Sequence, residues 1–117
     1  MQIKQKRVSK VRLSPQPKLP TTFKQLVRKE IRKYDWNDSV AVAVAMAESG
    51  LNANAEGDSS TAYSSWGVFQ IRELPGRPEA SQLVKYKFNI KYAYNMWKTQ
   101  GWYPWSCYTN NSYRQYL

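Results

Sequence analysis

The chain has 117 residues, 42% of them hydrophobic, which is enough for one small domain with a packed core. It contains no histidine and a single cysteine, Cys107. A Ser-His-Asp triad, a Cys-His pair, an imidazole zinc site and an intramolecular disulfide are therefore excluded. The remaining acid–base candidates are eight carboxylates together with Lys and Tyr side chains. Five Trp and nine Tyr suit either a core or a cleft that stacks on a polar ligand.

The formal net charge of +10 is confined to the N-terminal part of the chain. Residues 1–33 carry eleven Lys and Arg against one acid, whereas residues 34–117 carry seven of each sign. Residues 1–20 also contain three prolines and little apolar periodicity. This composition predicts a basic arm or linker at 1–20, followed by a single domain at 21–117. Such an arm is either solvated without a partner or attracted to a polyanion.

The first predicted helix starts at residue 22. Thr22 followed by Gln25 has the form of a capping box, and apolar residues then recur at helical spacing. The apolar positions are Phe23, Leu26, Val27, Ile31 and Tyr34. The opposite face is basic and holds Lys24, Arg28, Lys29, Arg32 and Lys33. We expect this amphipathic helix to pack its apolar face on the domain rather than to lie on a membrane.

A second, buried helix is predicted to begin at Asn37 or Asp38 and to end at Gly50. Val and Ala alternate from Val40 to Ala47, which could also indicate a strand, but Ala strongly favours a helix. A helix that is apolar on every side belongs in the centre of a domain. Glu48 would lie on its last turn, where the helix dipole and partial burial both raise a carboxyl pKa. A carboxyl protonated near neutral pH can serve as a general acid; the alternative is a side chain that turns into solvent.

The stretch from Glu48 to Ile71 resembles the lysozyme-like superfamily, in particular soluble-type lytic transglycosylases and goose-type lysozymes. The shared pattern is Glu-Ser at the end of a buried helix, a polar loop, and then Gly-x-x-Gln-Ile at 67–71. Asn89-Ile90, Tyr92-Ala93 and residues 101–105 also resemble the later part of these domains, so the resemblance covers about 34–110. It implies a mainly α, two-lobed domain with a central cleft and a possible short β-hairpin, preceded here by the basic arm.

The resemblance implies an enzyme that cleaves the glycan strands of bacterial peptidoglycan, with Glu48 as the catalytic acid and without a metal or cofactor. Trp105 would then pack on Glu48 and favour its protonated form. The substrate-binding residues that the resemblance implies are Ser49, Ser65, Gly67, Val68, Phe69, Gln70, Tyr92 and Trp105.

A second carboxylate is the point on which the reaction depends. Retaining and inverting glycosidases use two acids, and in animal c-type lysozymes the second lies five residues before the motif glutamine, where this chain has Ser65. Glu48 acting alone implies a lytic transglycosylase, in which the N-acetyl group supports the cation and the muramic acid 6-hydroxyl attacks. The alternative is a hydrolytic muramidase in which Glu56 or Asp58 positions water, although both also suit solvated turns.

A non-catalytic module that binds polyanions or cell wall is a third hypothesis. Nucleic acid is disfavoured as a partner, because most aromatic residues lie outside the basic arm. The arm would then contact an anionic wall polymer. No apolar run reaches the length of a membrane span, and no secretory signal is visible at the N-terminus. The resemblance implies a protein that acts at the cell envelope or outside the cell, either secreted or phage-borne, and we expect a monomer.

Overall fold

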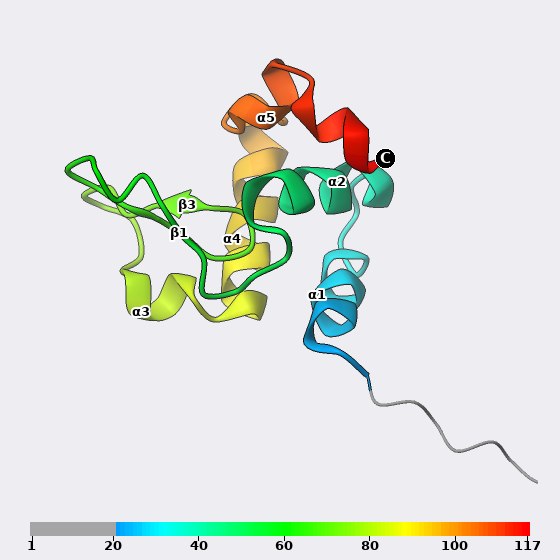
Figure 1. Ribbon diagram of the computed structural model, residues 1–117, viewed down its shortest axis with the longest axis horizontal. Coiled ribbons are helices and arrows are strands. Elements are labelled where there is room, and N and C mark those ends of the chain that lie inside the picture. The colour runs from blue at the N-terminus through cyan, green and yellow to red at the C-terminus, as the bar shows by residue number, and fades with distance from the viewer. Residues whose placement is uncertain (1–20) are drawn as a thin grey trace, which may run out of the picture.

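The computed structural model describes residues 21–117, so the basic arm predicted at 1–20 lies outside the described residues. Within that range the chain is mainly helical with one small sheet, as the sequence predicts (Figure 1). No helix there combines the length and apolar character needed to cross a membrane. In chain order the elements are α1 (Phe23–Ile31), α2 (Asp38–Ser49), β1 (Glu56–Gly57), β2 (Ser65–Trp66), β3 (Ile71–Arg72), α3 (Ala80–Leu83), α4 (Tyr86–Gln100), α5 (Ser106–Thr109) and the 3-10 helix η1 (Ser112–Tyr116).

Helix α1 begins with the predicted capping box. The Gln25 N–H donates to Thr22 Oγ1 over 3.2 Å, and the Thr22 N–H donates to Gln25 Oε1 over 2.8 Å. The helix ends at Ile31, three residues before Tyr34, which therefore lies beyond the helix. The capping prediction is confirmed, and the helix is shorter than its apolar pattern indicates.

Only half of the apolar face of α1 packs on the domain. Val27 and Ile31 are fully buried where α1 packs on α2 and α4. Phe23 and Leu26, on the first turn, keep 47% and 39% of their surface exposed.

Helix α2 lies at the centre of the described fold and packs on α1, α5 and η1. The Val40 N–H donates to Asn37 Oδ1 over 3.0 Å at its start, and Gly50 ends it with a left-handed φ of 63°. Leu51 also adopts a positive φ of 65°, which is rare for a branched residue and is held here by complete burial of the side chain. The helical interpretation of the Val–Ala alternation is confirmed.

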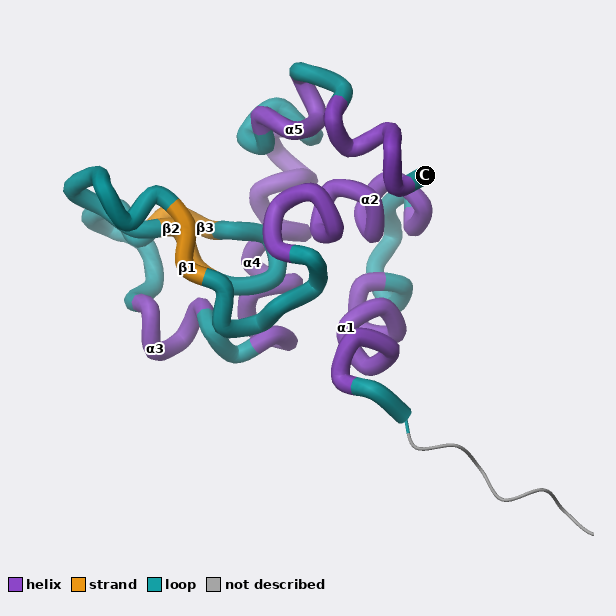
Figure 2. The backbone as a smooth tube through the Cα atoms, viewed as in Figure 1, coloured by secondary structure: helices purple, strands orange, loops and turns teal. Residues whose placement is uncertain are grey.

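The polar segment between α2 and α3 forms a three-stranded antiparallel sheet in the order β1-β2-β3 (Figure 2). Gly57 pairs with Ser65, and Ser65 pairs in turn with Arg72. The sheet therefore contains the expected hairpin and one further strand. Its central strand β2 places Ser65 between Gly57 on β1 and Arg72 on β3.

The buried amide of Asn89 on α4 connects the sheet region to the helices. Its Nδ2 donates to the carbonyls of Trp66 and Leu83 over 2.8 and 2.9 Å, and its Oδ1 accepts from the Phe69 N–H over 2.9 Å. Gly67 lies against this amide with a φ of 81°, and an added Cβ would collide with Asn89 Nδ2 and the Leu83 carbonyl. The glycine of the motif is thus required for close approach of α4.

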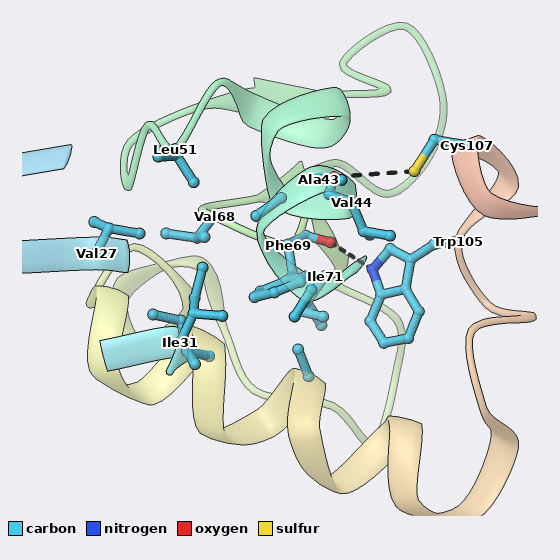
Figure 3. Close-up of a cluster of buried hydrophobic side chains, with 14 of the residues drawn as sticks. Val27, Ile31, Ala43, Val44, Leu51, Val68, Phe69, Ile71, Trp105 and Cys107 are labelled. Atoms are coloured by element: carbon cyan, nitrogen blue, oxygen red, sulfur yellow. Dashed lines mark hydrogen bonds between the residues drawn. The ribbon is translucent and has the colours of Figure 1, made fainter. Parts of the chain in front are cut away.

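The aromatic part of the core gathers around Trp36, which lies between α1 and α2. Its indole N–H donates to the Ile31 carbonyl over 2.8 Å, and its ring stacks on Trp102 at 5.4 Å. Phe69 contacts both Trp36 and Trp105 through ring–ring packing. Figure 3 shows part of the buried hydrophobic cluster, in which the Trp105 indole lies beside Phe69.

We expect Asn89→Ala to destabilise the protein by about 3 kcal/mol or more, because the Phe69 N–H and two carbonyls would stay buried without partners. Chemical denaturation measures the free energy of unfolding. Asn95→Ala on the exposed side of α4 is the matched control and should change it by less than about 0.5 kcal/mol. Equal effects of the two substitutions would contradict the structural role of the Asn89 amide.

Candidate functional site

A cleft of about 500 Å³ opens between the sheet and the C-terminal end of α4. It is lined by residues from α2, the sheet and its loops, α4 and the start of α5: Glu48, Asp58, Ser65, Gln70, Ile71, Arg72, Leu74, Arg77, Met96, Gln100, Pro104, Trp105 and Ser106. The cleft thus brings together five of the residues that the sequence singled out, namely Glu48, Asp58, Ser65, Gln70 and Trp105.

Glu48 occupies the last turn of α2 and is half-buried at the cleft. Burial raises the pKa of its carboxyl, and the negative charge of Asp58 raises it further. A hydrogen bond from the Cys107 thiol acts in the opposite direction and lowers it. The net pKa is raised, so this carboxyl keeps its proton to a higher pH than an ordinary glutamate does, which is the direction that a proton donor requires.

Cys107 is a buried neighbour of Glu48 that the sequence did not indicate. Its Sγ lies 3.9 Å from the carbonyl oxygen of Val44, one helical turn before Glu48 on α2 (Figure 3). Burial, the hydrogen bond to Glu48 and the charge of that carboxylate raise the thiol pKa to about 12. The sulfur therefore stays a neutral thiol that can donate to the carboxylate.

Asp58 reaches the cleft from the loop after β1. Its Oδ2 accepts a hydrogen bond of 2.6 Å from the hydroxyl of Ser65, which is itself buried on β2. The Asp58 backbone adopts a left-handed φ of 56°, a conformation that Asp tolerates better than most residues. Glu56 instead is exposed, accepts from the Ser64 hydroxyl over 2.8 Å, and does not line the cleft. Of the two loop acids, the structure brings only Asp58 to Glu48.

Several predicted binding residues lie behind the cleft rather than in it. The Ser49 hydroxyl donates to the Val68 carbonyl over 2.7 Å, and the side chains of Val68 and Phe69 are fully buried. Trp105 does line the cleft, and its indole N–H donates to the Phe69 carbonyl over 2.9 Å, which connects the cleft wall to these buried residues (Figure 3). Gly67 is likewise buried against Asn89. These residues position the side chains that line the cleft, and their own polar groups are already bonded internally.

Gln70 does line the cleft, but its amide nitrogen is used internally. Nε2 donates to the carbonyls of Ala55 and Gly67, each over 3.0 Å. Its Oε1 lies against Gly57, where an added Cβ would collide with it. Gln70 therefore fixes the loop before β1 to the motif turn.

Tyr92 lies outside the cleft lining and stacks on Phe88 at a ring distance of 6.4 Å. Helix α4 contributes Met96 and Gln100 to the cleft instead. The sequence pattern indicated that α4 reaches the cleft but selected a residue on an earlier turn.

Two arginines line the cleft that the sequence did not indicate. Arg72 donates to the Tyr63 carbonyl over 3.2 Å and to Thr61 Oγ1 over 3.0 Å, so its guanidinium is held by the loop after β1. Arg77 donates to the Arg72 carbonyl over 3.4 Å. Nothing in a single sequence distinguishes these arginines from solvated ones. Within residues 21–117, no group of three or more Cys, Asp or Glu side chains is arranged to hold a metal ion.

Residues 35–107 match the model of a protein family that is described as a lysozyme-like domain. The matched segment covers α2, the whole sheet and α4, and it includes every residue that lines the cleft. No curated protein and no solved structure matches this chain.

The raised pKa of Glu48 predicts a pH-dependent cost to stability. Because the folded-state pKa exceeds the ordinary value of 4.5, the native state binds this proton more tightly than the unfolded chain does. Stability is therefore lost as pH rises from the ordinary value through the folded-state pKa. We expect Glu48→Gln to be more stable than the original protein at pH 7, with the difference vanishing below about pH 4. Thermal denaturation at a series of pH values measures the difference in stability between the two proteins. A Glu48→Gln protein that is less stable than the original at pH 7 would contradict the burial of the charge. Glu79→Gln, at an exposed carboxylate outside the cleft, is the control.

Proposed function

Because this chain belongs to the family of lysozyme-like domains, we propose that it cleaves the β-1,4 bond between N-acetylmuramic acid and N-acetylglucosamine in bacterial peptidoglycan. The observation that carries the proposal is Glu48, a carboxyl with a raised pKa at the wall of an open cleft. In its protonated form it can donate to the glycosidic oxygen as the C1–O bond breaks. The substrate is a component of the cell envelope, so the protein would act there or outside the cell.

A hydrolytic route is supported by the position of Asp58. Its carboxylate is anchored by the Ser65 hydroxyl and influences the Glu48 carboxyl across the cleft. A negative charge there stabilises the oxocarbenium-like transition state, and a carboxylate oxygen can orient a water molecule toward C1. The water oxygen bonds to C1 and gives one proton to the Asp58 carboxylate or to the deprotonated Glu48. The product carries a reducing end. The Ser65 hydroxyl on β2 would thus hold the Asp58 carboxylate, which comes from the loop after β1.

A lytic transglycosylase is the second candidate. At the position where c-type lysozymes have their second acid this chain has Ser65, which carries no charge. In that route Glu48 first protonates the leaving oxygen, and the substrate's own N-acetyl group supports the cation. The Glu48 carboxylate then takes the proton of the muramic acid 6-hydroxyl as that oxygen bonds to C1. The product is a 1,6-anhydro sugar, and no water is consumed.

We expect Glu48→Gln to lower the rate at which the full chain clears a peptidoglycan suspension by at least about 100-fold, because the amide cannot donate the proton. The Glu79→Gln control should clear the suspension at the original rate. Turbidity measures the rate, and circular dichroism shows that the variant is folded. A Glu48→Gln protein with full activity would refute the proposed function.

Mass spectrometry of the released muropeptides distinguishes the two routes. For hydrolysis we expect reducing ends, and we expect Asp58→Asn to slow the reaction by at least about tenfold, whereas Glu56→Gln in the same loop should have no effect. Ser65→Ala should have a smaller effect in the same direction, because it frees the Asp58 carboxylate. Anhydro ends combined with full activity of Asp58→Asn would establish the transglycosylase route instead.

A further inference from the structure

Positive charge gathers at one end of the described fold. Residues 22–33 and 85–91 carry eight Lys and Arg and a single acid, whereas the other described residues carry four Lys and Arg and seven acids. The two basic segments adjoin because α1 packs on α4, with the rings of Phe23 and Tyr86 at 5.1 Å. The single acid, Glu30, is buried and paired with Lys33 over 3.0 Å. Within residues 21–117 the other seven cations of this set make no ion pair.

The same end presents apolar surface between its cations. Phe23 and Leu26 are about half and two-fifths exposed on the first turn of α1. Beside Phe23 a shallow groove is lined by Val84, Tyr86 and Phe88, and most of its lining is apolar. Lys85 and Lys87 border the groove and are exposed. Partly exposed apolar side chains and adjacent exposed lysines together form an amphipathic surface.

This end lies away from the cleft. Tyr86 is the first residue of α4, whereas the cleft residues Met96 and Gln100 lie ten and fourteen positions further along the helix. At a rise of about 1.5 Å per residue, the two sites are roughly 15–20 Å apart along α4. A partner that binds the basic end therefore leaves the cleft open.

We propose that this end, formed by the start of α1 and the start of α4, docks on a membrane surface of anionic phospholipid. Phe23 and Leu26 enter the boundary between headgroups and acyl chains, while the surrounding Lys and Arg contact headgroup phosphates. Charge complementarity selects an anionic partner. The exposed apolar pair favours lipid over a soluble phosphate polymer, because such a polymer offers nothing apolar for Phe23 and Leu26 to bury against.

The test is co-sedimentation of the full chain with vesicles of phosphatidylcholine, with or without phosphatidylglycerol. We expect binding to the phosphatidylglycerol vesicles alone. Phe23→Ser/Leu26→Ser keeps every charge and should weaken binding by at least about tenfold. Lys85→Glu/Lys87→Glu keeps the apolar pair and should weaken it by a similar factor. Lys98→Glu/Arg114→Glu makes the same charge change elsewhere on the surface and should leave the affinity within about twofold.

Every variant retains residues 1–20, so attraction by that basic segment is common to all of them. Wild-type affinity in both surface variants would assign the binding to residues 1–20 and overturn the proposal. Unchanged affinity of the Phe23→Ser/Leu26→Ser protein, with weaker binding of the Lys85→Glu/Lys87→Glu protein, would indicate a polyanion site and overturn the lipid assignment. Failure of the original chain to bind phosphatidylglycerol vesicles would overturn it outright. Thermal unfolding verifies that each variant is folded, and Leu26→Ser alone serves if the double variant is not.

Discussion

The architecture of the cleft depends on one buried amide. Asn89 bonds the Phe69 N–H and two carbonyls, and so fixes the motif turn against α4. Its close approach admits only glycine at position 67. The turn then presents the Phe69 carbonyl to the Trp105 indole, which joins the wall of the cleft that contains Glu48. A polar side chain with no contact to the cleft thereby determines the cleft's shape, because a buried amide tolerates only one arrangement of partners.

The acidity of Glu48 results from opposing influences in one small space. Burial and the Asp58 charge favour its protonated form, while the Cys107 thiol favours the carboxylate. In the proposed hydrolytic reaction Asp58 would therefore act twice in the same direction: its charge favours the protonated form of Glu48, and it would place negative charge where positive charge develops. The Ser65 hydroxyl holds that charge at a fixed point.

Local signals were sufficient for the features that local chemistry controls. The Thr22 cap, the start of α2 to within one residue, its end at Gly50 and the position of Glu48 all follow from residue types within a few positions of each other. The sequence named both Glu56 and Asp58 as candidate second acids but could not choose between them, because the loop reaches the cleft through a left-handed residue that no periodic pattern marks. It could not place Cys107 either, since the contact with α2 joins segments far apart in the chain. The sequence predicted the apolar face of α1. Its helical spacing does not show, however, that the first turn with Phe23 and Leu26 stays exposed while Val27 and Ile31 are buried.

The state of Cys107 has a practical consequence. With a pKa of about 12, the thiol is almost entirely un-ionised at neutral pH, and it is also buried. Alkylating reagents and disulfide exchange both require an accessible thiolate. The only cysteine of the chain should therefore remain unmodified in the folded protein. Single cysteines introduced on either rim of the cleft could then carry fluorescent or spin labels selectively, without first removing the native thiol beside Glu48.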